Sequence, residues 1–293
     1  MRLLLLGKNG QVGWELQRSL APLGEVIALD RSNGGDISDL SELAAQIQAV
    51  RPDVIINAAA HTAVDKAETE RELALRLNAE APEVMAQEAR KLGSLLVHYS
   101  TDYVFDGGGA APRKETDATG PLSVYGLTKL DGEQRIAATG CRYLILRTSW
   151  VYAARGGNFA KTMLRLAQER ENLSVINDQW GAPTGADLIA DVTAHAIRHA
   201  TANEGERGLY HLVASGETTW HAYASHVIER ARVLRPDLAW KVQEIAAVPT
   251  AAFPTPAHRP LNSRLETRKL QTAMRLHLPS WQQGVDRMLQ EIL

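Results

Sequence analysis

A tyrosine and a lysine four positions apart, Tyr125 and Lys129, are the pair in this sequence best suited to acid–base chemistry. Residues four apart on a helix project from the same face, so the phenol and the ammonium would lie side by side. A neighbouring cation favours the phenolate, so we expect Lys129 to lower the pKa of Tyr125 from its ordinary value of about 10. A tyrosine tuned in this way could give a proton to a carbonyl oxygen or take one from an alcohol near neutral pH.

A second polar cluster lies upstream, where residues 99–106 follow the apolar run Leu95–Val97. The run predicts a buried strand, and open α/β sheets bind their ligands at the carboxyl ends of such strands. Thr101 would then be placed to hydrogen-bond the same carbonyl oxygen that Tyr125 protonates. A Tyr-x-x-x-Lys pattern alone is a weak motif. The two features together indicate an active site much more strongly than either one.

The beginning of the chain has a strand–loop–helix pattern that fits a phosphate site. The apolar run Arg2–Leu6 is typical of a buried parallel strand. It is followed by three loop glycines and by apolar residues at helical spacing, namely Gly7, Gly10 and Gly13, then Val12, Leu16 and Leu20. Such glycines allow a tight turn and a close approach to a pyrophosphate, which the positive end of the helix favours. Taken alone, they fit a tight turn without a ligand equally well.

The next predicted strand, over residues 25–30, ends in a carboxylate that bears on the choice of cofactor. Asp30 follows Gly13 by 17 residues. An acid at this place accepts hydrogen bonds from a ribose 2′-hydroxyl, which favours NAD. Arg31 comes directly after it and could instead pair with the 2′-phosphate of NADP. Both cofactors therefore stay open.

Strands and helices alternate through the first half of the chain, which predicts a parallel sheet with right-handed crossovers. Further strands are expected at 53–57, 95–101, 143–147, 173–176 and 208–213. Helices are expected from a cap at Ser38 or Ser41 to about Val50, over about 70–92, at 125–129, 159–166, 187–199 and 220–233 (capped by Thr218 or Thr219), and from 281. Residues 249–260 hold four prolines and predict an extended loop.

The fold class that this alternation predicts is α/β. We expect a Rossmann-type parallel sheet with helices on both faces, plus a smaller C-terminal α/β substrate domain. Residues 1–152, with 183–217 returning to them, would form the dinucleotide-binding domain. Residues 153–182 and 218–293 would form the substrate-binding domain.

Composition excludes several classes of protein. The 293 residues are 45% apolar and 23% charged, with a net charge of −2, so nothing indicates a nucleic-acid or anionic-membrane partner. The only cysteine, Cys141, rules out an internal disulfide and fits a reducing compartment. No apolar run reaches the roughly 18 residues of a membrane span. We expect a soluble, cytoplasmic protein.

These motifs resemble the extended short-chain dehydrogenase/reductase family over essentially the whole chain. The resemblance rests on the glycine loop, Asp30, the turn 57–59, Thr101, and Tyr125 with Lys129. It narrows to reductases of dTDP-linked 4-keto-6-deoxysugars through the segments 99–105, 147–152, 177–184 and 259–263. It implies that NADPH or NADH reduces a 4-keto group in the last step of dTDP-L-rhamnose synthesis, for a cell-surface polysaccharide such as O-antigen.

The resemblance also implies a role for each site residue. Tyr125 would protonate the developing alkoxide, Lys129 would lower the tyrosine pKa and hold the nicotinamide ribose, and Thr101 would polarise the carbonyl. The implied cofactor contacts are Gly10, Gln11 and Val12 at the pyrophosphate with Gly7 and Gly13 in the same loop, Asp30 at the adenosine ribose, Asp36 and Ile37 at the adenine, and Ala60, His61, Thr62 and Tyr103 along the rest. Thr101, Asp102 and Trp150 would lie on the side of the sugar nucleotide.

Some members of the family hold Mg²⁺ with carboxylates between subunits. The resemblance therefore implies a homodimer with Glu15, Asp187 and Glu291 as metal ligands, since carboxylates suit Mg²⁺. Three solvated surface acids are at least as good an interpretation.

Two other functions stay open. An epimerase or dehydratase on the same scaffold would recycle tightly held NAD⁺, although a dehydratase would want a second acid beside Asp102. A non-catalytic regulatory subunit commonly lacks the tyrosine or the lysine, and this chain has both.

Overall fold

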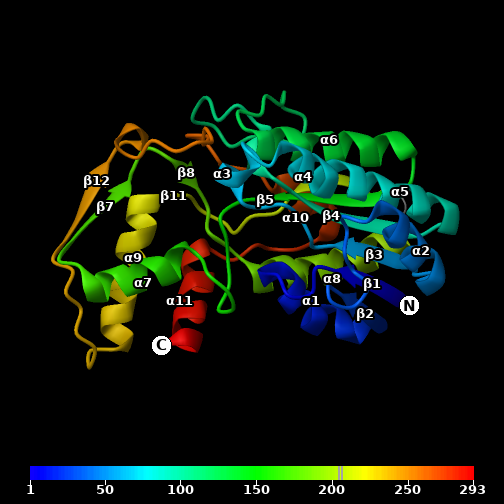
Figure 1. The fold of residues 1–293 in the computed structure, drawn as a ribbon. Helices are drawn as coiled ribbons and strands as arrows, with labels where there is room; N and C mark the ends of the chain where they lie inside the picture. The colour runs from blue at the N-terminus through cyan, green and yellow to red at the C-terminus, as the bar shows by residue number, and fades with distance from the viewer. Residues whose placement is uncertain (204, 206) are drawn as a thin grey trace.

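The computed structural model describes residues 1–203, 205 and 207–293, and a six-stranded parallel sheet with helices on both faces forms its centre (Figure 1). The sheet order β10-β5-β4-β3-β1-β2 is built from β1 (Arg2–Leu6), β2 (Glu25–Leu29), β3 (Val54–Asn57), β4 (Leu95–Thr101), β5 (Arg142–Thr148) and β10 (Gly208–His211). β1 pairs with β2 on one side and with β3 on the other, so the sheet changes its direction of growth there. Open α/β sheets bind ligands at such a switch point. The predicted α/β class with a Rossmann-type sheet is confirmed.

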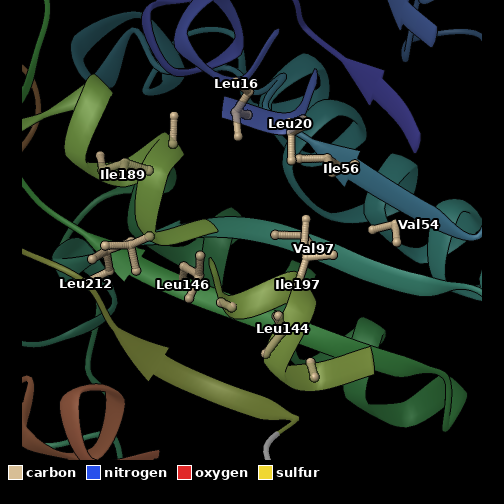
Figure 2. Close-up of a cluster of buried hydrophobic side chains, with 14 of the residues drawn as sticks. Leu16, Leu20, Val54, Ile56, Val97, Leu144, Leu146, Ile189, Ile197 and Leu212 are labelled. Carbon is tan, nitrogen blue, oxygen red and sulfur yellow. The ribbon is translucent and has the colours of Figure 1, made fainter. Parts of the chain in front are cut away.

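The central strands are apolar on both faces because helices cover both faces. Successive side chains of a strand point to opposite sides. Leu3 and Leu5 therefore join one buried cluster, part of which Figure 2 shows, whereas Leu4 and Leu6 join another. The covering helices are α1 (Gln11–Leu20) and α8 (Ala186–Ala202) on the first side, and α2 (Leu40–Val50), α5 (Ala81–Leu92) and α6 (Val124–Thr139) on the second. Because both faces of these strands are buried, their sequences are continuous apolar runs, and this made the strands predictable.

The cap of α2 differs from the expectation. Asp39, not Ser38 or Ser41, caps the helix, and its side chain accepts hydrogen bonds from the backbone N–H groups of Ser41 and Glu42 at 3.1 and 2.9 Å. Ser38 is engaged elsewhere, because its hydroxyl donates to Asp36 at 2.8 Å.

The long helix expected over about 70–92 contains a wider turn. It consists of α4 (Arg71–Leu75), a π-helical turn (Arg76–Glu80) and α5. Pro82 has no N–H to donate to the carbonyl of Asn78, and its ring would collide with that carbonyl in a regular α-helix. A π turn at this place relieves the collision.

A second core lies beside the sheet (Figure 1). It is built from α7 (Phe159–Glu169), α9 (Trp220–Leu234), α11 (Trp281–Ile292) and the parallel pair β7 (Asn172–Ile176) and β12 (Glu244–Val248). Tyr223 and Trp281 meet inside it with ring centroids 5.8 Å apart. Thr219 caps α9, as one of the two predicted alternatives.

Short elements complete the chain. They are α3 (Val64–Ala67), α10 (Arg268–Met274), β6 (Val151–Tyr152), β8 (Trp180–Gly181), β9 (Thr184–Gly185) and β11 (Thr218–Thr219). The sequence predicted none of these short elements, and it did not predict β12. Within the described part of the chain, no helix has the length and apolar character that a membrane crossing requires.

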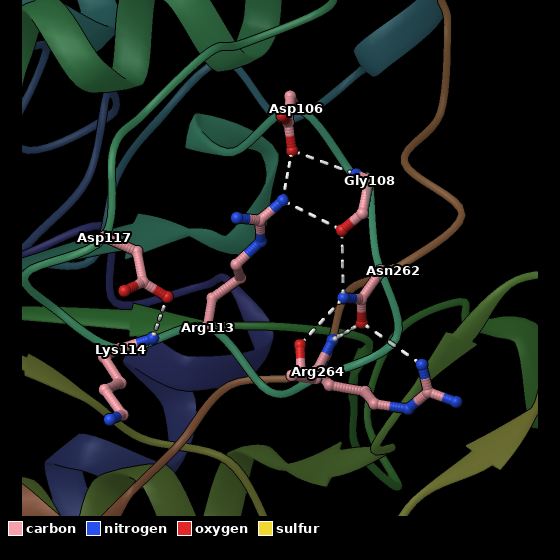
Figure 3. Close-up of polar contacts among 8 residues, drawn as sticks. Asp106, Gly108, Arg113, Lys114, Asp117, Asn262 and Arg264 are labelled. Carbon is pink, nitrogen blue, oxygen red and sulfur yellow. Dashed lines mark hydrogen bonds and ion pairs between the residues drawn. The ribbon is translucent and has the colours of Figure 1, made fainter.

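Hydrogen bonds tie the loop after β4 to the C-terminal segment (Figure 3). Asp106 accepts from the backbone N–H of Gly108 at 2.9 Å and from the Arg113 guanidinium. Asn262 donates to the carbonyls of Gly108 and Ala111 at 3.3 and 2.9 Å. This network holds the segment around Asn262 beside the carboxyl end of β4.

Candidate active site

A cavity of about 710 Å³ opens at the carboxyl ends of the central strands. The predicted site residues that line it are Gly7, Gly10, Gln11, Val12, Asp30, Ile37, Ala60, Thr62, Thr101, Asp102, Tyr103, Tyr125, Lys129 and Trp150. Three predicted cofactor residues do not line it: Gly13, Asp36 and His61. Asp36 instead accepts from Ser38, and the His61 ring lies 2.8 Å from Glu70.

The glycine loop has the shape that a pyrophosphate needs. Gly7 has a φ of +87°, which favours glycine. A Cβ on Gly13 would lie 2.0 Å from the carbonyl oxygen of Gly7, so only glycine lets α1 begin this close to β1. Gly10 precedes the helix without any side-chain cap, which leaves the positive helix end directed at the cavity. The loop therefore fits a bound phosphate group.

Asp30 is held by donors at the far end of the cavity. Its carboxylate accepts from the backbone N–H and hydroxyl of Ser32 at 2.8 and 2.6 Å and from the side chain of Asn9, and Lys8 lies 3.8 Å away. These hydrogen bonds from Ser32, with the charge of Lys8, hold the pKa of Asp30 below its ordinary value. Arg31 lines the same end. A carboxylate and a guanidinium are thus both available to an adenosine ribose.

Helix α6 delivers Tyr125 and Lys129 to the cavity wall. Ser123 caps the helix by accepting from the backbone N–H of Gly126 at 3.2 Å. The Tyr125 ring packs edge-on against Tyr103, with centroids 5.5 Å apart. Lys129 is 2% exposed, and its Nζ donates to the carbonyl of Tyr99 at 2.6 Å.

The expected lowering of the Tyr125 pKa is wrong in this structure. Burial raises the pKa of Tyr125 to about 12, and the neighbouring Asp102 adds to the increase, whereas a hydrogen bond with Thr101 opposes it. The burial of Tyr125 outweighs the effect expected of Lys129, whose Nζ is directed at His98 and Tyr99 of β4 and is itself desolvated. Burial lowers the pKa of Lys129 to about 8, against the opposing charge of Glu133.

Asp102 is a buried acid beside the tyrosine. It is 2% exposed, and burial raises its pKa to about 7, although hydrogen bonds with Ser263 and Thr101 favour the charged form. Its Oδ1 accepts from the Thr101 hydroxyl at 3.2 Å, and Oδ2 has no hydrogen-bond partner within the described residues. Asp102 lines the cavity, although its Oδ2 is itself shielded from solvent.

Two tryptophans form an aromatic part of the cavity wall. Trp150 and Trp220 are stacked, with centroids 3.7 Å apart and an interplanar angle of 17°. Gly181 packs against Trp150, where an added Cβ would lie 2.8 Å from the indole. Trp150 has a φ of +47°, a strained conformation for a bulky residue. No sequence pattern pointed to Trp220, because only the fold brings the second core to this wall.

Two further positioning side chains were also missed. Asn78, in the π turn, accepts from the backbone N–H of His61 at 2.9 Å and donates to the His61 carbonyl and the Thr128 hydroxyl at 3.1 Å each. It fixes the predicted cofactor segment around His61. Pro82, inside a predicted helix, was the available sign of an irregular turn. The other residue is His98, whose Nε2 lies 3.1 Å from Nζ of Lys129.

The expected magnesium ligands do not form a coordination shell in one chain. Glu15, Asp187 and Glu291 line one shared cavity. However, Arg18 lies 3.6 Å from Glu15 and Arg287 lies 3.5 Å from Asp187, so arginines already balance these charges. Across residues 1–203, 205 and 207–293, no group of three or more His, Cys, Asp or Glu side chains is arranged to hold a metal. The magnesium site expected between subunits stays a prediction, because one chain alone does not assemble it.

Comparisons with known proteins agree over the full length. The family model described as RmlD substrate binding domain matches residues 1–293. A dTDP-4-dehydrorhamnose reductase of Shigella flexneri is 59% identical over 295 residues, which cover 100% of this chain and 98% of that protein. The crystal structure of a dTDP-4-dehydrorhamnose reductase from Clostridium acetobutylicum has a TM-score of 0.91 at 34% identity, covering 100% and 99% of the two chains. The Bacillus anthracis reductase, solved in complex with NADP, has a TM-score of 0.89 at 35% identity, covering 99% of each chain.

Proposed function

Because the chain belongs to the RmlD substrate binding domain family, we infer that it reduces the 4-keto group of dTDP-4-dehydro-β-L-rhamnose with NAD(P)H to give dTDP-L-rhamnose. The family resemblance that the sequence indicated is thereby confirmed. The observation that carries the assignment is one cavity with the glycine loop at one end and Thr101, Tyr125 and Lys129 at the other. Delivery of the product to a cell-surface polysaccharide such as O-antigen belongs to the same proposal.

The cavity is suited to a dinucleotide. The uncapped start of α1 would bind the pyrophosphate, Asp30 or Arg31 the adenosine ribose, and the segment around Ala60 the rest. A bound reduced nicotinamide supplies the hydride that the reaction needs. The protein supplies the position of the 4-keto group and the proton.

In the proposed mechanism, Tyr125 gives its phenolic proton to the oxygen of the 4-keto group as negative charge develops there. A pKa of about 12 keeps the phenol protonated in the resting enzyme, which is the form that can donate. The Thr101 hydroxyl donates a hydrogen bond to the same oxygen, and this bond strengthens as charge builds up. Lys129, when charged, stabilises the phenolate left behind until solvent returns the proton.

Asp102 and Trp150 would bind the sugar nucleotide. Asp102 lines the cavity beside Thr101, which supports a contact with the sugar. The stacked Trp150 and Trp220 offer an apolar wall to the methyl-bearing sugar or the thymine.

We propose the domain division expected from the sequence, with 1–152 and 183–217 around the cofactor and 153–182 and 218–293 around the substrate. The two separate cores support it. Helix α10 is an exception to this division, because it packs in the core of the sheet although it lies within 218–293.

A cytoplasmic homodimer completes the proposal. Cys141 is buried and free, which fits a reducing compartment. The expected interface includes the surface around Glu15, where Trp14 is 45% exposed and packs under the guanidinium of Arg155. Analytical ultracentrifugation of Trp14→Glu, compared with wild type, tests the interface.

The decisive experiment follows oxidation of NADPH and NADH with the 4-keto-L-rhamnosyl nucleotide. Wild type consumes cofactor in proportion to product, and Tyr125→Phe lowers the rate by roughly 10²-fold or more. Cofactor that co-purifies and is not consumed would favour the epimerase class instead. No turnover with either cofactor would favour a regulatory subunit.

A further inference from the structure

A chain of buried side chains runs from the turn after β3 to Lys129. Oδ1 of Asn57 accepts a hydrogen bond from the backbone N–H of Ala59 at 3.1 Å. Nδ2 of Asn57 lies 3.1 Å from Nδ1 of His98, and Nε2 of His98 lies 3.1 Å from Nζ of Lys129. Asn57 and His98 are each 1% exposed and Lys129 is 2% exposed, so bulk water does not compete for these contacts.

The backbone N–H of Ala59 decides which atoms donate along this chain, because it can only donate. Oδ1 of Asn57 must face it, and the amide nitrogen, which is a donor, then faces His98. Nδ1 of His98 must therefore accept, and a neutral imidazole with an unprotonated Nδ1 carries its hydrogen on Nε2. Burial and the charge of Lys129 hold the pKa of His98 well below its ordinary value, which excludes the doubly protonated ring.

An Nε2–H group that faces Lys129 can donate only to an uncharged amine, because an ammonium group has no lone pair. The amine can still donate to the carbonyl of Tyr99. We propose that His98 is a positioning residue for Lys129, and that Asn57 holds it in the tautomer that favours the uncharged amine. The inference rests on the proposed function, in which charged Lys129 assists Tyr125.

The pH at which Lys129 loses its charge depends on the titratable and charged groups near it. They are Tyr125 and Glu133 on α6, His98 and Tyr99 on β4, and Arg147 on β5, which is paired with Glu133. Glu133 favours the ammonium, whereas burial is the larger effect and lowers the pKa of Lys129 to about 8. Because kcat/KM reports groups of the free enzyme, it should fall as pH rises through about 8.

Asn57→Asp tests the role of His98. The carboxylate keeps the shape of the side chain and still accepts from Ala59, but it presents an acceptor to Nδ1. His98 then carries its hydrogen on Nδ1, and its Nε2 accepts from the ammonium. We expect the alkaline fall of kcat/KM to move upward by about one pH unit or more, which corresponds to a tenfold shift in the proton equilibrium. A purely structural role would lower kcat/KM at every pH without moving the fall.

The new carboxylate could raise the pKa of Lys129 through the tautomer of His98 or by attracting the ammonium directly, and the double variant Asn57→Asp/His98→Phe separates the two effects. If the alkaline fall of kcat/KM loses most of its upward shift in the double variant, the effect acts through His98. If the upward shift persists in full, the proposed role of His98 is overturned.

Nitrogen-15 NMR of wild type gives a second measurement that does not depend on the folding of Asn57→Asp. At a pH of about 9, above the titration of Lys129, the His98 resonances, identified among nine histidines by their loss in His98→Phe, should show the Nε2–H tautomer. The Nδ1–H tautomer would overturn the inference. Wild type that reduces the sugar with no alkaline fall between about pH 7 and 10 would overturn this inference alone, whereas wild type with no turnover would overturn the proposed function.

Discussion

Glu133 and Arg147 form a bidentate ion pair buried between α6 and β5. Nε of Arg147 lies 2.9 Å from Oε1 of Glu133, and Nη2 lies 2.6 Å from Oε2. The two residues are 6% and 3% exposed. Glu133 follows Lys129 by one helical turn, and Arg147 lies next to the last residue of β5. The pair therefore fixes the helix that carries Tyr125 and Lys129 against the sheet that carries Thr101.

Arg147→Met should destabilise the protein strongly, because it leaves the Glu133 carboxylate buried without its partner. Breaking a buried pair in this way costs about 3–5 kcal/mol of the free energy of unfolding. Urea unfolding of Arg147→Met measures this cost. Arg165→Met is the matched control, because Arg165 and its partner Glu169 are 60% and 50% exposed, and such pairs contribute about 0–1 kcal/mol. The double variant Arg147→Met/Glu133→Leu should recover much of the loss; equal losses in the single and double variants would contradict the role of the unpaired charge.

The buried carboxyl of Asp102 should make the protein less stable as pH rises. Its pKa is raised to about 7 in the folded protein, so the folded state binds the proton more tightly than the unfolded chain does. The free energy of unfolding then falls with pH between about 4 and 7, and levels off above. Asp102→Asn removes this dependence. Denaturant unfolding should find the variant more stable than wild type at about pH 8, with the difference vanishing near pH 4; a difference independent of pH would refute the buried acid as its cause.

The sequence predicted best those elements whose structure is determined by the pattern of their own residues. β1 and β3 are covered on both faces and therefore read as apolar runs, and the glycine loop occupies a strand-to-helix turn where close packing demands glycine. β12 was missed because its residues are only half-buried, so its pairing with β7 rather than its own pattern makes it a strand.

The sequence predicted most of the residues that line the site, but it did not predict their pKa values. Spacing correctly put Tyr125 and Lys129 on one helix, but the direction of a side chain and its burial depend on the rest of the fold. The tyrosine pKa is therefore raised where the neighbouring lysine alone would have lowered it. Trp220 and His98 meet the site across the tertiary structure, and no spacing in the sequence connects them with it.

Arg31 should decide how well the enzyme distinguishes NADPH from NADH. It lines the cavity beside Asp30, whose carboxylate is already engaged by Ser32 and faces Lys8. A guanidinium at this place can bind a 2′-phosphate through charge-assisted hydrogen bonds. Arg31→Ala is expected to lower the ratio of kcat/KM for NADPH over NADH roughly tenfold, mainly through KM for NADPH. Arg18→Ala, on α1 and away from this cavity, is the control. An unchanged ratio in Arg31→Ala would assign the 2′-phosphate to another group.

Trp220 should contribute to sugar-nucleotide binding and not to cofactor binding. It lines the cavity from the second core, stacks on Trp150, and donates from its indole N–H to Gln179 at 3.0 Å. Trp220→Leu removes the ring that holds the strained Trp150 in place, so the wall facing the sugar nucleotide loosens. We expect KM for the sugar nucleotide to rise about tenfold, in line with the roughly 0.5–1.5 kcal/mol of an aromatic pair plus lost contact area, while KM for NADPH stays within about twofold.

Trp240→Leu is the matched control, because Trp240 packs against the same core and donates to the carbonyl of Arg235 far from the cavity. Steady-state kinetics with each substrate varied in turn separates the two effects. An equal rise of both KM values in Trp220→Leu would mean that the substitution disturbs the whole cavity, and the specific role of Trp220 in binding the sugar nucleotide would be lost.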